Sequence, residues 1–443
     1  MNDMRQLSIA VVGSGISGIA AAWLLGTRHR VTLIEKAGRL GGHAHTVTVA
    51  VPEGERAVDT GFIVYNTVSY PNLVAFFAAL GVPTAASNMS FAVSLGTGRY
   101  EYSGTGLGGL FGQWSNLLRP GHWRMVADLV RFFPDARRLA ESGADEDISL
   151  GAWLQAEGYS TAFVDRHILP MGAAIWSTPS REMLSFPALA FARFFSNHGL
   201  LQVRDRPQWR TVVGGSREYV TRAVAASGAA VISSNPVQRI VRRPDGVDIE
   251  LADATTARFD HVVIATHADE ARALLADADD NERATLGAFR YAANTAVLHD
   301  DPGLMPARRR LWSSWNFLGT DDGRLAVSYW MNRLQPLATR RDLFVTLNPP
   351  RPPRAGNVIV TCDYRHPMFD RNAMAAQRRL WALQGRRRTW LCGSYFGFGF
   401  HEDGIQAGLA VAEDLGGVRR PWAVADESGR IHRTTAPVTL AAE

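Results

Sequence analysis

The stretch "LSIAVVGSGISGIAAAWLL", residues 7–25, decides the fold of this chain. It opens with a β-branched, apolar run that is typical of a buried parallel strand, and apolar residues at helical spacing follow. Between the two, Gly13, Gly15 and Gly18 have the spacing G-x-G-x-x-G. In such a motif the first glycine allows a tight turn, the second lets a pyrophosphate approach, and the third permits close helix–strand packing. The strand–turn–helix setting therefore predicts a dinucleotide-binding domain.

A second predicted strand, "RVTLIE", ends in Glu35, at the distance from the glycines that this motif requires. A carboxylate there accepts hydrogen bonds from an adenosine ribose and disfavours a 2′-phosphate. The pyrophosphate is expected at the helix N-terminus, where free N–H groups and the helix dipole favour negative charge.

The same glycine spacing occurs again in "YSGTGLGGLFGQW", residues 102–114, at Gly104, Gly106 and Gly109. The residues before it, "GRYEYS", are charged and polar rather than typical of a buried strand. Gly112 and Pro120 leave little room for a helix after it, and no strand ending in an acid follows. We therefore predict a loop here, and one dinucleotide site in the chain.

Composition fits an ordinary globular protein of 443 residues, with 46% hydrophobic and 20% charged residues. The net charge of +5 comes almost wholly from arginine, because Lys36 is the single lysine. No basic run is interleaved with aromatics, so nucleic acid is not an expected partner. Two short clusters, Arg308–Arg310 and Arg386–Arg388, are interpreted as solvated surface, with a phosphate or anionic-lipid contact as the alternative.

Only Cys362 and Cys392 occur, which provides no disulfide framework and no metal-ligand spacing. This usage fits a reducing cytoplasm, and no metal site is expected. Two uncharged stretches, 7–27 and 60–98, are interrupted by glycines or prolines and do not predict a membrane helix. We expect a soluble cytoplasmic protein, with peripheral contact at the inner membrane face left open.

Past Glu35 the sequence continues "KAGRLGGHAHTVTV". The pattern of Glu35, Arg39, Gly41 and Gly42 resembles that of the flavin-containing amine oxidoreductase superfamily, which includes monoamine and polyamine oxidases, protoporphyrinogen oxidase and phytoene desaturases. The residue after the glycine pair is often arginine in that family, and here it is His43.

Four later stretches resemble the family in the same order along the chain. "VDTGFIVYN" resembles the segment that runs along the flavin, at Gly61 and Phe62. "VVGGSREYVTRAVAASG" precedes a strand in which Val237 matches a backbone contact to the adenine, and "FDHVVIATHADEARALL" resembles the strand that returns the chain to the substrate domain. The last stretch, "TWLCGSYFGFGFHEDGIQAGLAVAEDL", contains a strand ending at Gly393 and a helix beginning near residue 401.

The resemblance implies an FAD cofactor, with the flavin at the N-terminus of that last helix. The implied cofactor-binding residues are Gly13, Ser14, Gly15, Ile16, Ser17, Gly18, Glu35, Lys36, Arg39, Gly41, Gly42, His43, Gly61, Phe62, Val237, Gly393, Ser394, His401 and Ile405. Two positions depart from the family: Ser394 stands where an acid is common, and Asp403 where many members carry a small residue.

The expected fold class is α/β, a Rossmann-like FAD-binding domain with a discontinuous, mixed α+β substrate domain. The cofactor domain is predicted from residues 1–70, 205–270 and 385–416, and the substrate domain from 71–204 and 271–384. The first of these substrate segments is predicted to be mainly helical and the second to contain strands. A tail, 417–443, carries no recognisable chemistry.

Many amine oxidases of the superfamily hold a lysine near the flavin, but Lys36 belongs to the adenosine end, so that role is vacant or filled otherwise. Phe400 matches one of the two aromatics that sandwich a substrate amine, and it suits an apolar substrate equally well. His401 is either a proton acceptor or a structural hydrogen-bonding group. Trp176 and neighbouring aromatics are either simply core or the wall of a channel for an acyl or isoprenoid chain.

The leading hypothesis is an FAD-dependent dehydrogenase or desaturase acting on an apolar small-molecule or lipid substrate. The chain resembles a bacterial subgroup associated with cyclopropane-fatty-acid-synthase-like methyltransferases, which implies a fatty acyl chain, methylated and still esterified in a phospholipid. The alternatives are an amine oxidase that produces peroxide, and an FAD-binding protein without turnover of its own. The electron acceptor, the oligomeric state and covalent attachment of the flavin stay open at this stage.

Overall fold

The computed structural model describes residues 5–142, 148–176, 180–197, 199–202, 206–321 and 324–433. Within these ranges, five parallel strands form one sheet in the order β10-β2-β1-β14-β20. Their bounds are Ala230–Ile232 (β10), Arg30–Ile34 (β2), Ser8–Val12 (β1), His261–Ile264 (β14) and Thr389–Leu391 (β20). The central strands β1 and β14 are buried almost throughout, which is why their sequences are continuous apolar runs.

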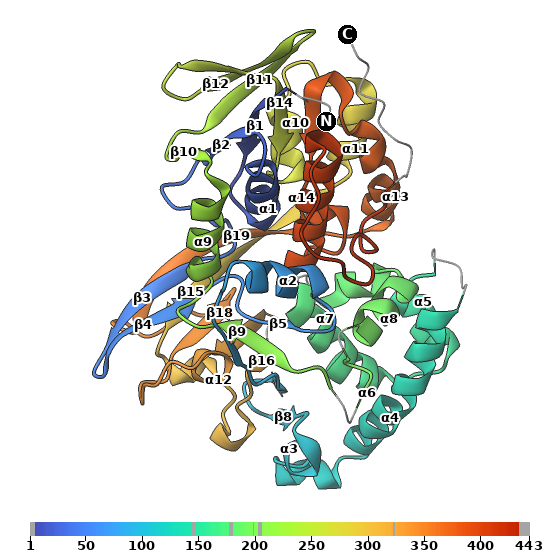
Figure 1. Ribbon diagram of the computed structural model, residues 1–443. Coiled ribbons are helices and arrows are strands. Elements are labelled where there is room, and N and C mark those ends of the chain that lie inside the picture. The colour runs from blue at the N-terminus through green and yellow to red at the C-terminus, as the bar shows by residue number, and fades with distance from the viewer. Residues whose placement is uncertain are drawn as a thin grey trace.

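Two helices from opposite ends of the chain pack together on this sheet, α1 (Ile16–Leu25) and α14 (His401–Gly416) (Figure 1). A side chain at Gly408 would overlap the backbone carbonyl of Ser17, and one at Gly404 would lie 2.8 Å from Ile16. Glycine at these two positions therefore lets the helices approach closely. Parallel strands flanked by helices confirm the predicted Rossmann-like α/β class for this part of the chain.

A mixed sheet forms the second large layer, below the parallel sheet in Figure 1. Its described strands follow the order β19-β15-β18-β17-β16-β7-β8, and every pair is antiparallel except β16 with β7. The bounds are Val358–Met368 (β19), Arg290–His299 (β15), Phe344–Leu347 (β18), Leu325–Trp330 (β17), Trp315–Gly319 (β16), Phe91–Leu95 (β7) and Tyr100–Ser103 (β8). Strands are therefore found in segment 271–384, where they are expected.

Helices gather beside this sheet, on the right of Figure 1. They are α4 (Pro120–Glu141), α5 (Leu150–Ala156), α6 (Thr161–Phe163), α7 (Leu169–Trp176) and α8 (Ala188–Asn197). The amphipathic pattern of the sequence agrees with them, although segment 71–204 also supplies β7 and β8.

Smaller elements complete the architecture. They are the hairpin β3 (Thr46–Val51) and β4 (Gly54–Asp59), the sheet of β5 (Tyr65–Asn66), β9 (Trp209–Val212) and β6 (Thr84–Ala86), the sheet of β11 (Val237–Arg243), β12 (Gly246–Leu251) and β13 (Thr256–Phe259), and the helices α2 (Pro71–Ala79), α3 (Gly106–Leu110), α9 (Arg217–Ser227), α10 (Ala268–Leu274), α11 (Asp280–Gly287), α12 (Met331–Leu334) and α13 (Arg371–Leu380). One continuous cluster of buried side chains runs through both large layers.

The second glycine motif is not simply a loop, as the sequence suggested. The residues before it form β8, whose four residues are all buried, and Gly106–Leu110 form the short helix α3. The error arises because polar residues of "YEYS" are buried by partners: the Glu101 carboxylate accepts hydrogen bonds from Ser94 and from the Ala307 backbone. β8 is the antiparallel edge of the mixed sheet, so this stretch lacks the parallel β–α setting of a dinucleotide site.

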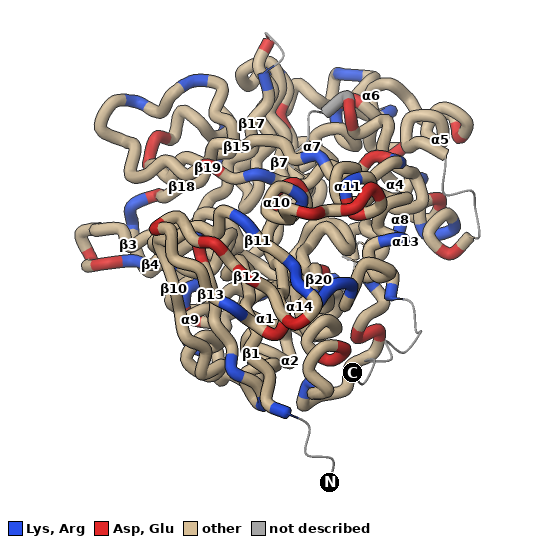
Figure 2. The backbone as a smooth tube through the Cα atoms, turned by 90° about the horizontal axis from the view of Figure 1, so that it is seen from above, with Lys and Arg blue, Asp and Glu red and all other residues tan. Residues whose placement is uncertain are grey.

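Charges on the upper side of the molecule are mixed in sign (Figure 2). Two arginines of the 386–388 cluster pair with acids there, Arg386 with Asp279 at 2.8 Å and Arg387 with Asp277. These pairs favour the surface interpretation of that cluster. Across the described residues, no helix combines the length and apolarity that a membrane crossing requires.

Candidate functional site

The turn from β1 into α1 is built tightly at its first and third glycines. Gly13 has φ +100°, and a side chain there would lie 2.9 Å from the carbonyl oxygen of Ala265 at the end of β14. A side chain at Gly18 would overlap the carbonyl oxygen of Gly13. Both glycines are therefore required by the packing of the protein itself.

Gly15 differs from both, because a Cβ built on it meets no protein atom within 4 Å. It is also the residue that precedes α1, and no side chain caps the N–H groups of that helix. Free N–H groups beside open space form the arrangement that binds a phosphate. The packing of the protein gives no reason for glycine at this position, whereas a pyrophosphate approaching the backbone does.

Glu35, at the end of β2, is connected to the same turn. One of its carboxylate oxygens accepts hydrogen bonds from the Ser14 backbone (2.9 Å) and the Ser14 hydroxyl (2.6 Å), and the other accepts from the Ala37 backbone at 3.0 Å. A carboxylate has about four acceptor positions, so this one still has capacity for a ribose hydroxyl. Lys36 turns to Glu270, with its Nζ 2.6 Å from the carboxylate.

The glycine pair lies directly on the first turn. The Gly41 N–H donates to the Ser14 carbonyl oxygen at 3.0 Å, and a side chain at Gly42 would lie 3.1 Å from the Gly15 Cα. The Arg39 guanidinium donates to the Gly42 carbonyl oxygen at 2.8 Å. The two glycine segments thus form one narrow cradle, as the family resemblance implies.

The segment at Gly61 and Phe62 lies against the residue that follows this cradle. A side chain at Gly61 would overlap the His43 carbonyl oxygen, and the Phe62 N–H donates to that oxygen at 2.8 Å. The Phe62 ring stacks on the His401 ring, with centroids 3.7 Å apart and planes 16° apart. Three sequence-predicted positions, distant along the chain, therefore meet here.

A buried carboxylate that the sequence analysis did not single out anchors this segment. Asp59 accepts hydrogen bonds from Thr46 (2.6 Å), from the Ser216 backbone (2.9 Å) and from Gln335 (2.8 Å). Burial raises the pKa of Asp59 to about 6, against the effect of these donors. The motif "VDTGF" offered the signal, because an acid beside a buried strand requires partners.

His401 is the first residue of α14, and its Nε2 lies 3.1 Å from the Tyr219 hydroxyl. Burial lowers the pKa of His401 to about 3. The ring is therefore neutral at neutral pH and a weak proton acceptor. Of the two sequence-based interpretations, this geometry favours the hydrogen-bonding one.

The remaining positions of the C-terminal motif surround that helix. Gly393 and Ser394 follow β20, and the Ser394 carbonyl oxygen accepts a hydrogen bond from the Gly399 N–H at 3.0 Å. Ile405 is fully buried one turn into α14, where a backbone N–H already bonds within the helix. Ile405 therefore contributes to the packing of α14 and offers no free N–H group to a cofactor.

Asp403, the unexplained departure from the family, stabilises its own helix. Its carboxylate accepts hydrogen bonds from the backbone N–H groups of Phe398 (3.0 Å) and Phe400 (2.8 Å), which places an acid at the positive end of α14. Its other oxygen pairs with Arg430 at 2.8 Å. The predicted tail therefore has a structural role, although its residues 434–443 lie outside the described ranges.

A cluster of histidines and tyrosine borders the glycine cradle, and only His43 of it was a predicted cofactor residue. The His43 ring lies 5.1 Å from the Tyr364 ring and 5.3 Å from the His366 ring. Burial lowers the pKa of His366 to about 4, and the His366 Nδ1 lies 2.9 Å from the Asn294 side-chain nitrogen. Because Tyr364 and His366 lie on β19, far along the chain, no local pattern marks them.

The His43 Nε2 is buried and has no hydrogen-bond partner in the described part of the protein. A buried polar atom without a partner is costly, so a polar group of a ligand fits there. Together with the open space at Gly15, this atom indicates that the cradle suits an FAD molecule. Val237 is the first residue of β11, where it pairs with Leu251 of β12.

The predicted substrate residues are connected through aromatic rings. Trp176, at the end of α7, lies 4.7 Å from Phe194 of α8, and Phe194 stacks on Phe400 at 4.9 Å. Phe400 directly precedes α14. Trp176 and Phe194 are buried in the main core, so a chain of aromatic contacts connects α7 and α8 with the start of α14.

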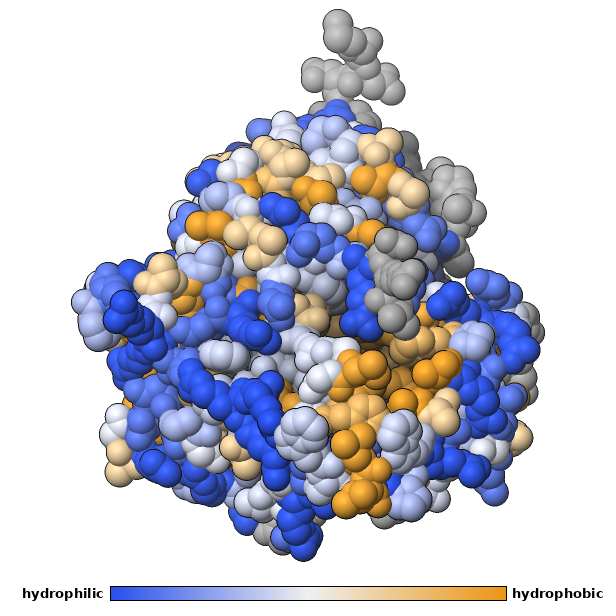
Figure 3. Space-filling model, turned by 90° about the horizontal axis from the view of Figure 1, so that it is seen from below, coloured by the Kyte–Doolittle hydropathy of each residue, from blue (hydrophilic) through white to orange (hydrophobic). Residues whose placement is uncertain are grey.

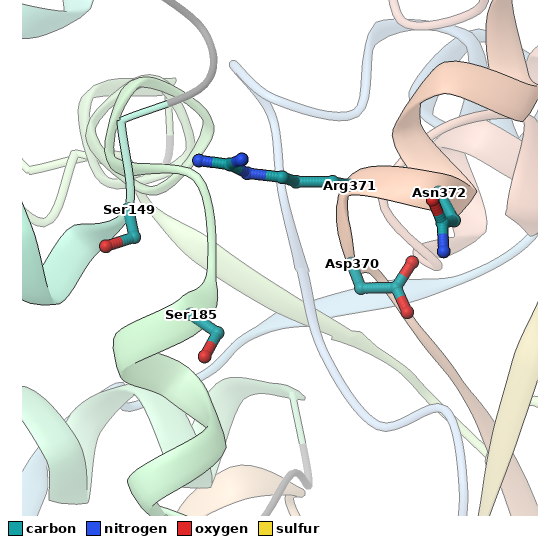
Figure 4. Close-up of a pocket in the computed structure, with 5 residues that line it drawn as sticks. All are labelled: Ser149, Ser185, Asp370, Arg371 and Asn372. Carbon is teal, nitrogen blue, oxygen red and sulfur yellow. The ribbon is translucent and has the colours of Figure 1, made fainter.

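A separate surface groove of about 460 Å³ lies between the residues Ser149 and Ser185 on one side and the start of α13 on the other. Its lining residues, drawn in Figure 4, are Ser149, Ser185, Asp370, Arg371 and Asn372. The Asp370 carboxylate caps the N-terminus of α13, where it accepts a hydrogen bond from the Ala373 N–H. None of these residues was a predicted site residue, and the groove is distinct from the glycine cradle.

Comparison with known families and relatives supports the interpretation of the glycine cradle as an FAD site. A family model described as flavin containing amine oxidoreductase matches residues 16–297. A Mycobacterium tuberculosis (strain H37Rv) protein named as a flavin-containing monoamine oxidase is 28% identical over 275 residues. That match covers 60% of this chain and 58% of the relative, so the similarity spans less than two thirds of the relative's length.

Solved structures share the fold over nearly the whole chain. A putrescine oxidase variant has a TM-score of 0.68 at 15% identity, covering 92% of this chain and 98% of its own. A fatty acid isomerase from P. acnes has a TM-score of 0.67 at 15% identity with the same coverage. Cyclohexylamine oxidase from Brevibacterium oxydans has a TM-score of 0.66 at 17% identity, covering 93% and 100%. At such identities the similarity concerns the fold alone.

Proposed function

Since the chain belongs to the flavin-containing amine oxidoreductase family, we propose that it is an FAD-dependent dehydrogenase or desaturase of a fatty acyl chain. In its most specific form, the substrate is a methylated acyl chain that is still esterified in a phospholipid. When bound, FAD would supply the acceptor for a hydride from a substrate carbon. The protein then has to orient that carbon and exclude water.

The observation that carries this proposal is the apolar environment at the start of α14. Phe400 directly precedes that helix and stacks on Phe194, which in turn contacts Trp176. Aliphatic carbon gains from such contacts through the hydrophobic effect, at about 0.8 kcal/mol for each buried CH₂ group. A phenylalanine is also a weaker partner for an ammonium group than tryptophan or tyrosine.

The position of lysine supports the same substrate class. Lys36 is the single lysine of the sequence, and its ammonium group pairs with Glu270 behind the adenosine end of the cradle. Its described ion-pair partner is therefore Glu270 rather than a residue at the start of α14. The assisted reoxidation that many amine oxidases obtain from a lysine has to come from another group or be lacking.

His401 acts in this proposal as a positioning residue. Stacking on Phe62 and the contact with the Tyr219 hydroxyl hold its ring in one orientation, and its lowered pKa keeps the ring neutral. It would thereby fix the first turn of α14, whose positive end would favour negative charge on bound FAD.

The test is anaerobic reduction of the purified, FAD-loaded protein by candidate substrates. Phospholipids with methylated and unmethylated acyl chains are compared with a panel of mono- and polyamines, and flavin absorbance near 450 nm is followed. We expect bleaching with an acyl lipid and a new double bond in the product by mass spectrometry. Bleaching by amines alone, with peroxide formed in air, contradicts the proposal.

The amine oxidase alternative is favoured by one finding, because putrescine oxidase and cyclohexylamine oxidase are among the proteins that share this fold. The fatty acid isomerase shares it equally well, so the fold accommodates both substrate classes. A third outcome identifies a protein without turnover: dithionite bleaches the flavin, but no acyl lipid or amine does so.

A further inference from the structure

A short segment at the lower end of the molecule holds five large apolar side chains in solvent. It runs through α3, a 3₁₀ turn at Trp114–Leu118 and the first turn of α4. The exposed fractions are 74% for Leu107, 71% for Trp114, 41% for Leu117, 87% for Leu118 and 50% for Trp123. We call these five residues the apolar face. Figure 3 shows the lower side of the molecule, where apolar side chains gather in one band.

Buried polar side chains hold this segment in place from behind. The Gln113 side chain accepts a hydrogen bond from the Glu101 N–H at 2.6 Å, and the Asn116 side chain donates to the Glu101 carbonyl oxygen at 2.8 Å. The His122 ring, also buried, lies 2.7 Å from the Tyr100 hydroxyl. These three polar side chains therefore point inward while the five apolar side chains point into solvent, the reverse of an ordinary solvated loop.

The charge around the apolar face is positive. Residues 104–127 contain Arg119 and Arg124 and no acidic residue. A third arginine, Arg310, places its guanidinium 6.0 Å from the Trp114 ring centroid, and it belongs to the 308–310 cluster noted in the sequence. Exposed tryptophan and leucine beside arginine match the interfacial region of a bilayer with anionic lipids.

We propose that the apolar face is a docking surface for anionic lipid bilayers. Leu107, Leu117 and Leu118 enter the boundary between headgroups and acyl chains, and the two tryptophans lie at headgroup level. The arginines pair with lipid phosphates and add attraction to an anionic surface. Charge complementarity selects this partner over a second copy of the chain, whose own apolar face is equally positive. The inference does not depend on which substrate the protein oxidises.

The test uses the full chain loaded with FAD and two kinds of vesicle, one of phosphatidylcholine and one with 30% phosphatidylglycerol. Co-sedimentation is expected with the anionic vesicles and at least ten-fold weaker with the neutral ones. Raising the salt from 0.1 to 0.5 M should weaken binding further, because screening shortens the reach of the arginines. Equal binding to both kinds of vesicle, or binding to neither, contradicts the proposal.

Variants distinguish binding through the apolar face from nonspecific adsorption to vesicles. Trp114→Ser with Leu118→Asp should reduce partitioning into vesicles at least ten-fold, because it removes two of the apolar side chains that enter the bilayer. The variant should still fold, since both side chains are mostly exposed to solvent. Arg124→Gln with Arg310→Gln should reduce binding to anionic vesicles alone, by about ten-fold or more. Val358→Asp is the matched control, because Val358 is 45% exposed on β19, at the opposite edge of the mixed sheet from β8.

Thermal melting and the flavin absorbance ratio establish that each variant is folded. If the variant lacking Trp114 and Leu118 is folded and binds anionic vesicles as tightly as the unchanged protein, the proposal is wrong. It is also wrong if sedimentation equilibrium reveals a dimer that the same variant dissociates, because the apolar face is then an interface between copies.

Discussion

Gly13, Gly15 and Gly18 share one motif, but the protein requires them for different reasons. At Gly13 and Gly18 a side chain would meet the backbone of the chain itself. At Gly15 it would meet nothing within 4 Å, and the backbone there is ordinary extended chain with φ −67°. Gly13 and Gly18 are therefore needed for folding, whereas Gly15 is expected to be needed for binding of the cofactor.

This difference predicts opposite behaviour for two variants. Gly15→Val should abolish FAD binding while leaving the melting temperature of the cofactor-free protein within about 2 °C, because the added atoms occupy ligand space. Gly18→Ala, the matched comparison, should lower that melting temperature as well, since its methyl overlaps a carbonyl oxygen. Absorbance at 450 nm relative to 280 nm measures the cofactor. A yellow Gly15→Val protein would contradict the assignment.

His401 allows a second prediction at the level of one side chain. If it positions rather than accepts a proton, His401→Asn should slow flavin reduction by less than about ten-fold, because asparagine keeps a hydrogen-bonding group near Tyr219. Removal of a true proton acceptor costs about 10²–10⁴-fold. Rapid-mixing kinetics with the active substrate measures the effect. A loss of 10³-fold would restore the proton-acceptor interpretation.

The sequence points to the residues that form the cradle because each belongs to a local motif with a known spacing, and their binding of FAD stays a prediction. Phe62 and His401 were both predicted at the flavin, and the structure stacks them. The sequence could not mark Tyr364, His366 or Asn294. Tyr364 and His366 reach the His43 ring from the distant strand β19, and Asn294 contacts His366 through the pairing of β15 with β19. No spacing rule connects those strands to the first glycine pair.

Among the elements, α14 depends on a contact with the residues after it. Asp403 is fully buried at its first turn, and it pairs with Arg430 as well as with two backbone N–H groups. Burial raises the pKa of the Asp403 carboxyl despite that arginine. The first turn of α14 is thus held by a charged residue, Arg430, that follows the helix in the sequence.

Removing either partner of this pair should be costly, and removing both together should cost less than the sum of the two single changes. Arg430→Ala leaves a buried carboxylate without its cation and should lower the free energy of unfolding by about 3 kcal/mol or more. Asp403→Ala should cost a similar amount, but the double variant should cost clearly less than the sum. Denaturant unfolding of all four proteins measures the coupling. Strict additivity would show that the two side chains are independent.

The strand β1 and the helix α1 followed from the sequence because their apolar periodicity is strong. β8 was missed because its polar side chains are satisfied by partners on distant segments, such as Ala307 with Glu101. Arg430 was missed for a related reason: a single arginine in a tail has no local pattern, although aspartate three residues after Phe400 is a recognisable capping position.

At the scale of the whole molecule, buried histidines make stability depend on pH. Burial lowers the pKa of His167, His261 and His299 to about 4 each, from an ordinary value of 6.5. The unfolded chain therefore binds more protons than the folded one between pH 6.5 and 4. Stability from these groups is fully present above pH 6.5 and is lost as the pH falls through 4.

Each such group contributes at most about 3 kcal/mol across that window, so we expect a steep loss of unfolding free energy between pH 7 and 4.5. Asp59 acts in the opposite sense: its pKa is raised to about 6, so its protonation favours the folded protein as the pH falls through that value. Asp59→Asn should therefore make the acid loss steeper. Denaturant unfolding at pH 7, 5.5 and 4.5 tests both statements, and a flat profile would contradict the first.

The α/β class and the presence of two layers follow from the sequence because they depend on local patterns repeated along the chain. The order of the parallel sheet does not, since β20 reaches β14 only after the entire mixed sheet has been traversed. The apolar face was also beyond prediction, because leucine and tryptophan at such spacing usually belong to a core.

The joining of α1 to α14 has a consequence for synthesis of the protein. Ser17 is synthesised well before Gly408, yet its backbone lies against that glycine. While a ribosome is still producing the segments between them, the first glycine turn lacks both the neighbouring helix α14 and the outer strand β20. The nascent chain must therefore keep an apolar helix shielded during that interval, and flavin loading has to wait until α14 has emerged.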